Sequence, residues 1–220
     1  MVEKLIVGRL LDFSRPLWPA GAPPPAQNPS VFVTQPQQFL NIAESTWSPF
    51  KRTSNVVAGQ HAAKAHRTFG WLTWLPGSIS EVQMGGSDVL TGPMSGCDLV
   101  LYRRGGLVYA GHLGTDVGAD VANTSVKTLW NNFATAHAAD VIGGFNPFIA
   151  VNGWVPARTG DDALGPPTYY GVYSTAHRFY TLVLYAQKVS SADTRPHATL
   201  KRIAGLRQIT SKSLHDLQNL

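Results

Sequence analysis

The sequence predicts an α+β fold in which most strands pair antiparallel. Short segments rich in aromatic and β-branched residues are bounded by glycine or proline, a pattern typical of strands. Two of these segments, between residues 98 and 112, flank a glycine turn and indicate a hairpin. One further stretch has the spacing of an amphipathic helix. At 220 residues the chain has the length of a single domain.

The first part of the chain is rich in proline, with seven of the 15 prolines between residues 16 and 36. Proline donates no ladder hydrogen bond and does not continue a helix, so we expect residues 1–36 to form an N-terminal segment with a semi-rigid arm. Residues 37–220 are then the single domain. The alternative is an extended segment that lies against that domain, because the apolar side chains of Trp18, Phe32 and their neighbours would then be buried.

The strands expected after this arm begin with residues 69–75, which end at Pro76-Gly77. Residues 98–103 and 107–112 form the expected hairpin around Arg104-Gly105-Gly106. Residues 147–151 and 178–188 are also expected to be strands, and the second is apolar enough to be central in a sheet.

Two helices are expected in the second half of the chain. Apolar residues from Val126 to Val141 fall on one helical face, with Thr124 or Ser125 as the N-cap and Gly143-Gly144 as the stop. Near the C-terminus, apolar residues recur every third position between 200 and 209, which suits a second helix despite Gly205.

The formal charge of +5 is spread along the chain, and no run of Lys or Arg is longer than two. The distribution therefore does not indicate nucleic-acid binding. The single cysteine, Cys97, excludes an internal disulfide and a zinc site built on paired cysteines. No apolar run has the length of a membrane span, and Gly8 and Arg9 interrupt the N-terminal apolar stretch. If the protein is exported, we expect a route without a cleavable signal peptide.

Cys97 and His112 are expected on adjacent antiparallel strands, on one sheet face at the mouth of a pocket. A turn at Arg104-Gly105 opposes them directly, whereas a turn at Gly105-Gly106 makes them a diagonal pair on the same face. A three-residue turn would place them on opposite faces. A thiol beside an imidazole that lowers its pKa is suited to attack an acyl carbon. Gly96 lets a substrate approach the backbone, and the N–H groups near Ser95 and Gly96 are candidates for an oxyanion hole. The alternative is a small buried cysteine beside a histidine that fills space.

Two motifs carry a resemblance to a known family. The segment Met94-Ser95-Gly96-Cys97, with a histidine fifteen residues later, resembles the Leu-Ser-Gly-Cys signature of the cytotoxic necrotizing factor catalytic domain. The upstream Pro76-Gly77-Ser78-Ile79-Ser80 resembles a segment of the Burkholderia lethal factor. The resemblance covers about residues 70–116. Met94 replaces the usual leucine, a volume-conserving change, and Gly92-Pro93 differs from both relatives.

The resemblance implies a bacterial toxin or effector that deamidates a glutamine of a target protein, with residues 37–220 as the catalytic domain. The implied fold is an antiparallel β-sandwich core flanked by helices and long loops. The implied catalytic residues are Cys97, His112 and Thr91, the last orienting the imidazole through its hydroxyl or its carbonyl. No cofactor or metal is implied. The implied partner is a protein such as a small GTPase or a translation factor, met in the cytosol of a host or target cell after secretion.

Two other functions remain open: a cysteine peptidase with the same Cys-His pair, and a basic binding module without activity. The remaining motifs favour neither a metal site nor a second active site. His61 and His66 lack the spacing of metal ligands on one helical face. Asp161-Asp162 is expected to be a solvated turn, and Asp98 and Asp116 are lesser candidates to orient the histidine. The aromatic residues that form either a core or a base-stacking platform are Trp71, Trp74, Tyr169, Tyr170 and Tyr173.

Overall fold

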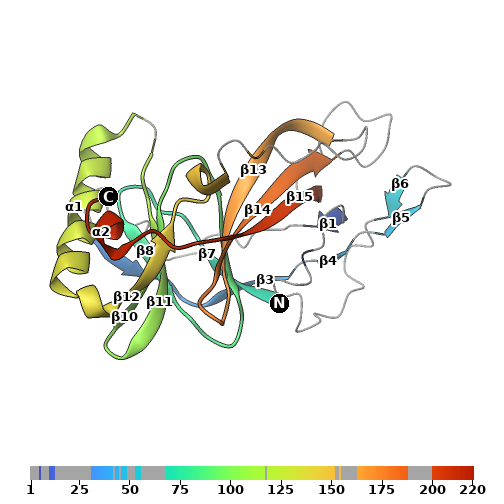
Figure 1. Ribbon diagram of the computed structural model, residues 1–220. Helices are drawn as coiled ribbons and strands as arrows, with labels where there is room; N and C mark the ends of the chain where they lie inside the picture. The colour runs from blue at the N-terminus through green and yellow to red at the C-terminus, as the bar shows by residue number, and fades with distance from the viewer. Residues whose placement is uncertain are drawn as a thin grey trace.

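The computed structural model of the protein describes most of the chain from residue 68 onward and short segments before it. The described residues are 5, 10–12, 31–41, 43–44, 46–48, 53–55, 68–116, 118–151, 154, 163–187 and 200–220. They form two large sheets, a small two-stranded sheet and two helices, of which only one is long (Figure 1).

The larger sheet has eight strands in the order β3-β7-β9-β13-β14-β15-β1-β4. All neighbouring strands are antiparallel except β7 and β9, which run parallel. Its strands are β1 (Leu10–Asp12), β3 (Gln38–Asn41), β4 (Ala43–Glu44), β7 (Thr68–Leu72), β9 (Val89–Met94), β13 (Ala163–Tyr173), β14 (Phe179–Gln187) and β15 (Leu200–Ile209).

The second sheet has five strands in the order β12-β10-β11-β8-β2, and only β2 and β8 are parallel. Its strands are β2 (Phe32–Thr34), β8 (Ile79–Gln83), β10 (Leu99–Arg104), β11 (Leu107–Leu113) and β12 (Val141–Phe145). The remaining elements are β5 (Thr46–Ser48), β6 (Thr53–Asn55), α1 (Asp120–Ala136), α2 (Leu214–Leu217) and the 3-10 turns η3 (Ala138–Asp140) and η4 (Ile149–Val151).

The two sheets pack face to face, and α1 covers the outer face of the five-stranded sheet (Figure 1). Leu99, Leu101 and Ala110 of the smaller sheet pack between the sheets against Val89 and Tyr173 of the larger one. Alternate residues of the same hairpin, such as Val100 and Tyr102, point outward and pack on Trp130 of α1. The predicted α+β fold with a sandwich-like core is confirmed, although each sheet includes one parallel pair.

The predicted hairpin is confirmed, with its turn at Gly105-Gly106. Both glycines have positive φ, as a two-residue turn of this kind requires. The register pairs Leu99 with His112, so the alternative with a turn at Arg104-Gly105 is wrong.

The predicted helix is present as α1, but its bounds differ. It begins at Asp120 and ends at Ala136, and Val141 belongs to β12. Gly144 is therefore a strand residue and not a helix stop. A Cβ atom there would lie 2.6 Å from the carbonyl oxygen of Leu99, so close approach of two strands is what requires glycine.

Two other predicted elements are wrong. Residues 200–209 form β15 and not a helix, because β14 on one side and β1 on the other complete its hydrogen bonds. Residues 147–151 form a turn and η4 and not a strand. At the proline-rich end, β2 pairs with β8, while residues 16–30 lie outside the described residues. None of the described helices is long and apolar enough to cross a membrane.

Candidate functional site

Cys97 lies on the connection between β9 and β10, two residues before β10 begins, and not within a strand as predicted. Its side chain is only 6% exposed, yet it borders a cavity of about 340 Å³. The end of β9, three connecting segments and the start of α1 line this cavity. The lining residues are Trp74, Pro93, Met94, Ser95, Gly96, Cys97, Thr115, Asp116 and Asn123.

Thr115 contacts the Cys97 thiol with both its carbonyl oxygen and its hydroxyl. The Sγ–H donates to the carbonyl oxygen of Thr115 at 3.4 Å, and the Thr115 hydroxyl donates to Sγ at the same distance. Burial raises the pKa of the Cys97 thiol, and the two hydrogen bonds with Thr115 offset this only in part. The thiol in this arrangement is therefore protonated at neutral pH. Sequence reasoning missed Thr115, because no motif marks it.

His112 lies on β11 and points into the space between the two sheets, where it is fully buried. Its Nδ1 atom lies 2.8 Å from the hydroxyl oxygen of Thr91, which comes from β9 of the opposite sheet. The contact with the ring is thus made by the Thr91 hydroxyl, one of the two groups considered from sequence. This hydrogen bond fixes the plane of the imidazole across the sandwich.

The other ring nitrogen of His112 is a buried polar atom that lacks a partner. Nε2 makes no hydrogen bond within the described structure. Burial lowers the pKa of His112 from 6.5 to about 3, so the ring is neutral at physiological pH. When Nδ1 carries the ring proton and donates it to the Thr91 hydroxyl, Nε2 is a free proton acceptor. The expectation that the imidazole lowers the thiol pKa is wrong here, because desolvation controls both groups.

Cys97 and His112 are near neighbours in the register. The Leu113 N–H donates to the carbonyl oxygen of Asp98 at 3.0 Å, which extends the β10–β11 ladder one residue beyond Leu99. Continuing that ladder makes Cys97 and His112 a diagonal pair, for which about 7 to 8 Å is usual. No hydrogen bond joins the two side chains in this part of the chain, and His112 does not line the cavity. The thiol must turn away from Thr115 to meet the imidazole.

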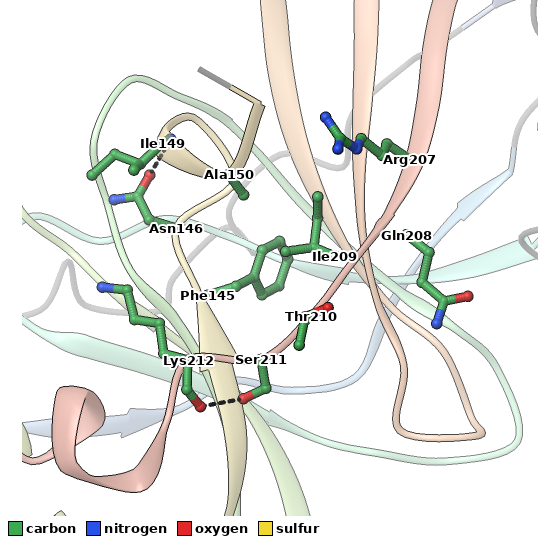
Figure 2. A pocket seen from close by; sticks show the side chains of 10 residues that line it. All are labelled: Phe145, Asn146, Ile149, Ala150, Arg207, Gln208, Ile209, Thr210, Ser211 and Lys212. Atoms are coloured by element: carbon green, nitrogen blue, oxygen red, sulfur yellow. Dashed lines mark hydrogen bonds between the residues drawn. The ribbon is translucent and has the colours of Figure 1, made fainter. Parts of the chain in front are cut away.

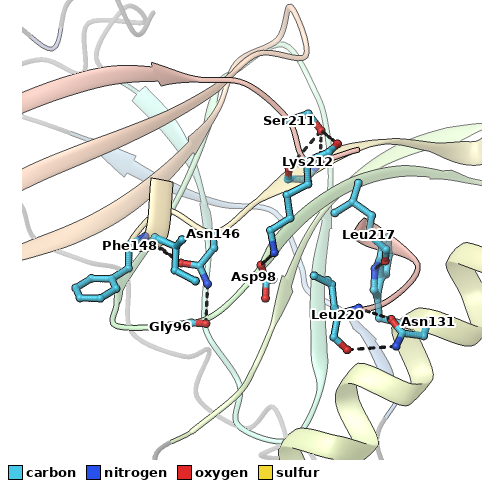
Figure 3. Close-up of polar contacts among 12 residues, drawn as sticks. Gly96, Asp98, Asn131, Asn146, Phe148, Ser211, Lys212, Leu217 and Leu220 are labelled. Carbon is cyan, nitrogen blue, oxygen red and sulfur yellow. Dashed lines mark hydrogen bonds and ion pairs between the residues drawn. The ribbon is translucent and has the colours of Figure 1, made fainter. Parts of the chain in front are cut away.

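The connection that holds Cys97 is fixed by two residues from distant parts of the chain (Figure 3). The Asn146 side-chain amide donates to the carbonyl oxygen of Gly96 at 2.8 Å, and its own oxygen accepts from Phe148 and Ile149. Lys212 forms an ion pair with Asp98 at 2.8 Å. Asp98, a lesser candidate from sequence, is thus paired with a lysine and not with His112. These contacts position residues 96–98 from both sides of the thiol.

The Pro76-Gly77-Ser78 segment packs directly beside this site. Gly77 donates to the carbonyl oxygen of Gly114, and Gly114 donates to that of Ser78. A Cβ atom at Gly114 would lie 1.8 Å from the carbonyl oxygen of Leu75, so only glycine fits there. The motif thereby fixes the chain just before Thr115, the residue that holds the thiol.

A second cavity, of about 390 Å³, lies between the ends of β12 and β15 (Figure 2). Phe145 and Ile209 form its apolar floor, and Arg207 and Lys212 stand on opposite sides of it. Asn146 and Lys212 border this cavity and also hold the Cys97 connection. The two cavities therefore share supporting side chains.

The other residues singled out from sequence have varied surroundings. Ser95 and Gly96 are exposed and line the first cavity, and Asp116 lines it too. Among the predicted aromatic residues, Trp71, Tyr170 and Tyr173 are buried in the core.

His61, His66, Asp161 and Asp162 lie outside the described residues. Among the residues that are described, no group of three or more His, Cys, Asp or Glu side chains is placed to hold a metal ion.

In comparisons with protein-family models, curated proteins and solved structures, nothing matches this chain. Any family assignment for it therefore depends on the Met94–Cys97 and Pro76–Ser80 motifs and on the geometry around Cys97 and His112.

Proposed function

We propose that this chain is a toxin or effector of the cytotoxic necrotizing factor type, which converts a glutamine side chain of a target protein into glutamate. The observation that carries the proposal is the hydrogen bond between Thr91 and His112 Nδ1. In the tautomer that donates Nδ1–H to Thr91, Nε2 is left as a free, neutral proton acceptor near the connection that bears the only thiol of the chain. Oriented imidazole and thiol are the two groups that acyl transfer through a thioester requires.

The reaction begins when the Cys97 thiol turns from Thr115 and gives its proton to His112 Nε2. Sulfur then attacks the amide carbon of the glutamine, a C–S bond forms, and the carbonyl electron pair moves onto oxygen. When the C=O bond forms again, the C–N bond breaks and the imidazolium protonates the departing nitrogen, which leaves as ammonia. Water, deprotonated by His112, hydrolyses the thioester and restores the thiol. An amine in place of water gives transglutamination.

The cavity beside Cys97 suits this substrate better than it suits a peptide backbone. Its volume of about 340 Å³ lies near the lower end of ligand-sized clefts, and we expect it to admit a glutamine side chain. Ser95 and Gly96 are exposed and line this cavity, and we expect their backbone N–H groups to face the attacked carbonyl. These features favour side-chain deamidation over cleavage of the main chain by a peptidase.

The target and its compartment form part of the same proposal and come from the resemblance. We place the activity in the cytosol of a host or target cell. A small GTPase or a translation factor is the type of partner that the resemblance suggests. The formal charge of +5 favours a target that presents an acidic surface.

The experiment that tests this function measures ammonia release from a desalted eukaryotic cell extract. We expect the wild-type chain to release ammonia without fragmenting proteins on a gel. Cys97→Ser and His112→Ala are each expected to abolish nearly all release, and the double variant to cost little more, because the two residues act as one unit. Ser125→Ala, on the exposed face of α1, is the matched control. Equal ammonia release by Cys97→Ser would refute the proposal, and protein fragments would indicate a peptidase.

A further inference from the structure

Trp74 contributes an unusual polar atom to the cavity at Cys97. The indole Nε1 is buried and makes no hydrogen bond, although it is a donor. The ring lines the cavity together with Cys97 and Thr115, and its N–H lies close enough to the thiol to favour the thiolate. The thiol sulfur is only a weak acceptor, and a buried N–H without a full hydrogen bond is costly in a folded protein. Its presence beside a cavity points to an acceptor that a ligand brings.

The backbone just before Trp74 is held by two hydrogen bonds. Gln35, which is only 6% exposed, uses both ends of its side-chain amide on the residue before Trp74. Its oxygen accepts from the Thr73 N–H at 2.9 Å, and its nitrogen donates to the Thr73 carbonyl oxygen at 2.6 Å. These hydrogen bonds fix the main chain next to Trp74, from which the indole extends, and such fixing is what a preorganised donor requires.

Two other polar side chains that line the cavity, Thr115 and Asn123, are already engaged. The Thr115 hydroxyl donates to the Cys97 sulfur. Asn123 accepts from the Asp116 N–H and donates to the Asp116 carbonyl oxygen. Among the described side chains of this cavity, the N–H of Trp74 is the buried donor that stays available to a substrate.

We propose that Trp74 Nε1–H donates a hydrogen bond to the side-chain carbonyl oxygen of the substrate glutamine and to the oxyanion that replaces it. The inference rests on the proposed function and makes Trp74 a catalytic residue of that reaction. When the Cys97 sulfur adds to the amide carbon, negative charge develops on this oxygen. The indole N–H, with backbone N–H groups near Ser95 and Gly96, stabilises the charge until the C–N bond breaks and ammonia leaves. Removing one donor of this kind typically lowers kcat about 100-fold or more.

The test uses a probe that does not depend on the target protein. A short peptide whose glutamine is replaced by glutamate γ-semialdehyde adds reversibly to a thiol, and the thiol proton ends on the former aldehyde oxygen. That oxygen occupies the position of the oxyanion. Protection of Cys97 from iodoacetamide gives the Kd of the aldehyde, and alkylation without aldehyde gives the intrinsic reactivity of the thiol.

Trp74→Phe keeps an aromatic ring and removes the N–H. We expect it to weaken aldehyde binding about tenfold, the value of one hydrogen bond, beyond any change in alkylation rate. Trp154→Phe, the same change at a partly buried tryptophan that does not line the cavity, should leave the Kd unchanged. Thermal melting checks the fold, and Trp74→Met repeats the test if Trp74→Phe melts early.

The two proposals fail in different ways. If the wild-type chain forms an adduct that Cys97→Ser lacks, and Trp74→Phe binds the aldehyde as tightly as the wild type, the role of Trp74 is wrong while the thiol chemistry stands. If the wild-type chain forms no adduct at Cys97, the proposed function fails and the role of Trp74 fails with it.

Discussion

The buried imidazole of His112 makes a prediction about acid stability. Burial lowers its pKa from 6.5 to about 3, because the charged ring would lose its hydration between the two sheets. At pH 7 the ring is neutral in the folded chain and mostly neutral in the unfolded chain, so its burial lowers the free energy of unfolding very little. As the pH falls below 6.5, His112 becomes protonated in the unfolded chain but not in the folded chain. The free energy of unfolding therefore decreases until the pH reaches about 3, where the folded chain also takes up the proton.

The size of this loss follows from linkage. Each pH unit between the two pKa values is worth about 1.4 kcal/mol, which gives roughly 2 kcal/mol by pH 5 and about 5 kcal/mol in all. Carboxylates titrate in the same range, so the contribution of His112 is obtained as a difference from His112→Gln, whose neutral amide does not titrate.

The assay is urea unfolding of both proteins from pH 7.5 to pH 4.5, followed by tryptophan fluorescence. The free energy of unfolding of the wild-type chain should fall relative to that of His112→Gln as the pH drops below 6.5. Parallel curves for the two proteins would show that His112 is protonated without cost, and the description of it as a buried neutral base would be wrong.

Three further predictions concern the surroundings of the thiol. Because burial raises the pKa of Cys97, its alkylation by iodoacetamide should keep accelerating above pH 9, and a plateau near neutral pH that His112→Ala removes would indicate a thiolate–imidazolium pair instead. Gly114→Ala should destabilise the fold by about 3 kcal/mol or more in urea unfolding, because its Cβ meets the Leu75 carbonyl, whereas Gly86→Ala, with open space around it, should be close to neutral. Asn146→Ala removes the hydrogen bond to the Gly96 carbonyl and should lower ammonia release clearly while changing the melting temperature little. Unchanged release would show that this contact does not position Cys97.

Local signals in the sequence were sufficient for the hairpin that carries His112. Gly105-Gly106 supplies the positive φ values that its turn needs, and the turn then fixes which residues face each other. They were not sufficient for β15, whose apolar residues recur every third position. In that segment hydrogen bonds to two neighbouring strands outweigh the local pattern.

The candidate site divides in the same way. Cys97 and His112 were found from a short motif and a spacing, and the Thr91 hydroxyl lies where the resemblance implies. Thr115, Asn146 and Lys212 were missed, because their roles depend on how distant segments return to the Cys97 connection. The raised pKa of the thiol was also unpredictable from sequence, since it follows from packing.

The proposed reaction at Cys97 converts a glutamine of another protein into glutamate. The most direct measurement is peptide-level mass spectrometry of a eukaryotic cell extract after incubation with the wild-type chain or with Cys97→Ser. We predict that one or a few peptides gain the mass of an amide-to-acid conversion at a glutamine, with the wild-type chain only. Two results would contradict the proposed reaction. One is the same conversions with Cys97→Ser, and the other is new cleavage of proteins by the wild-type chain without any glutamine conversion specific to it.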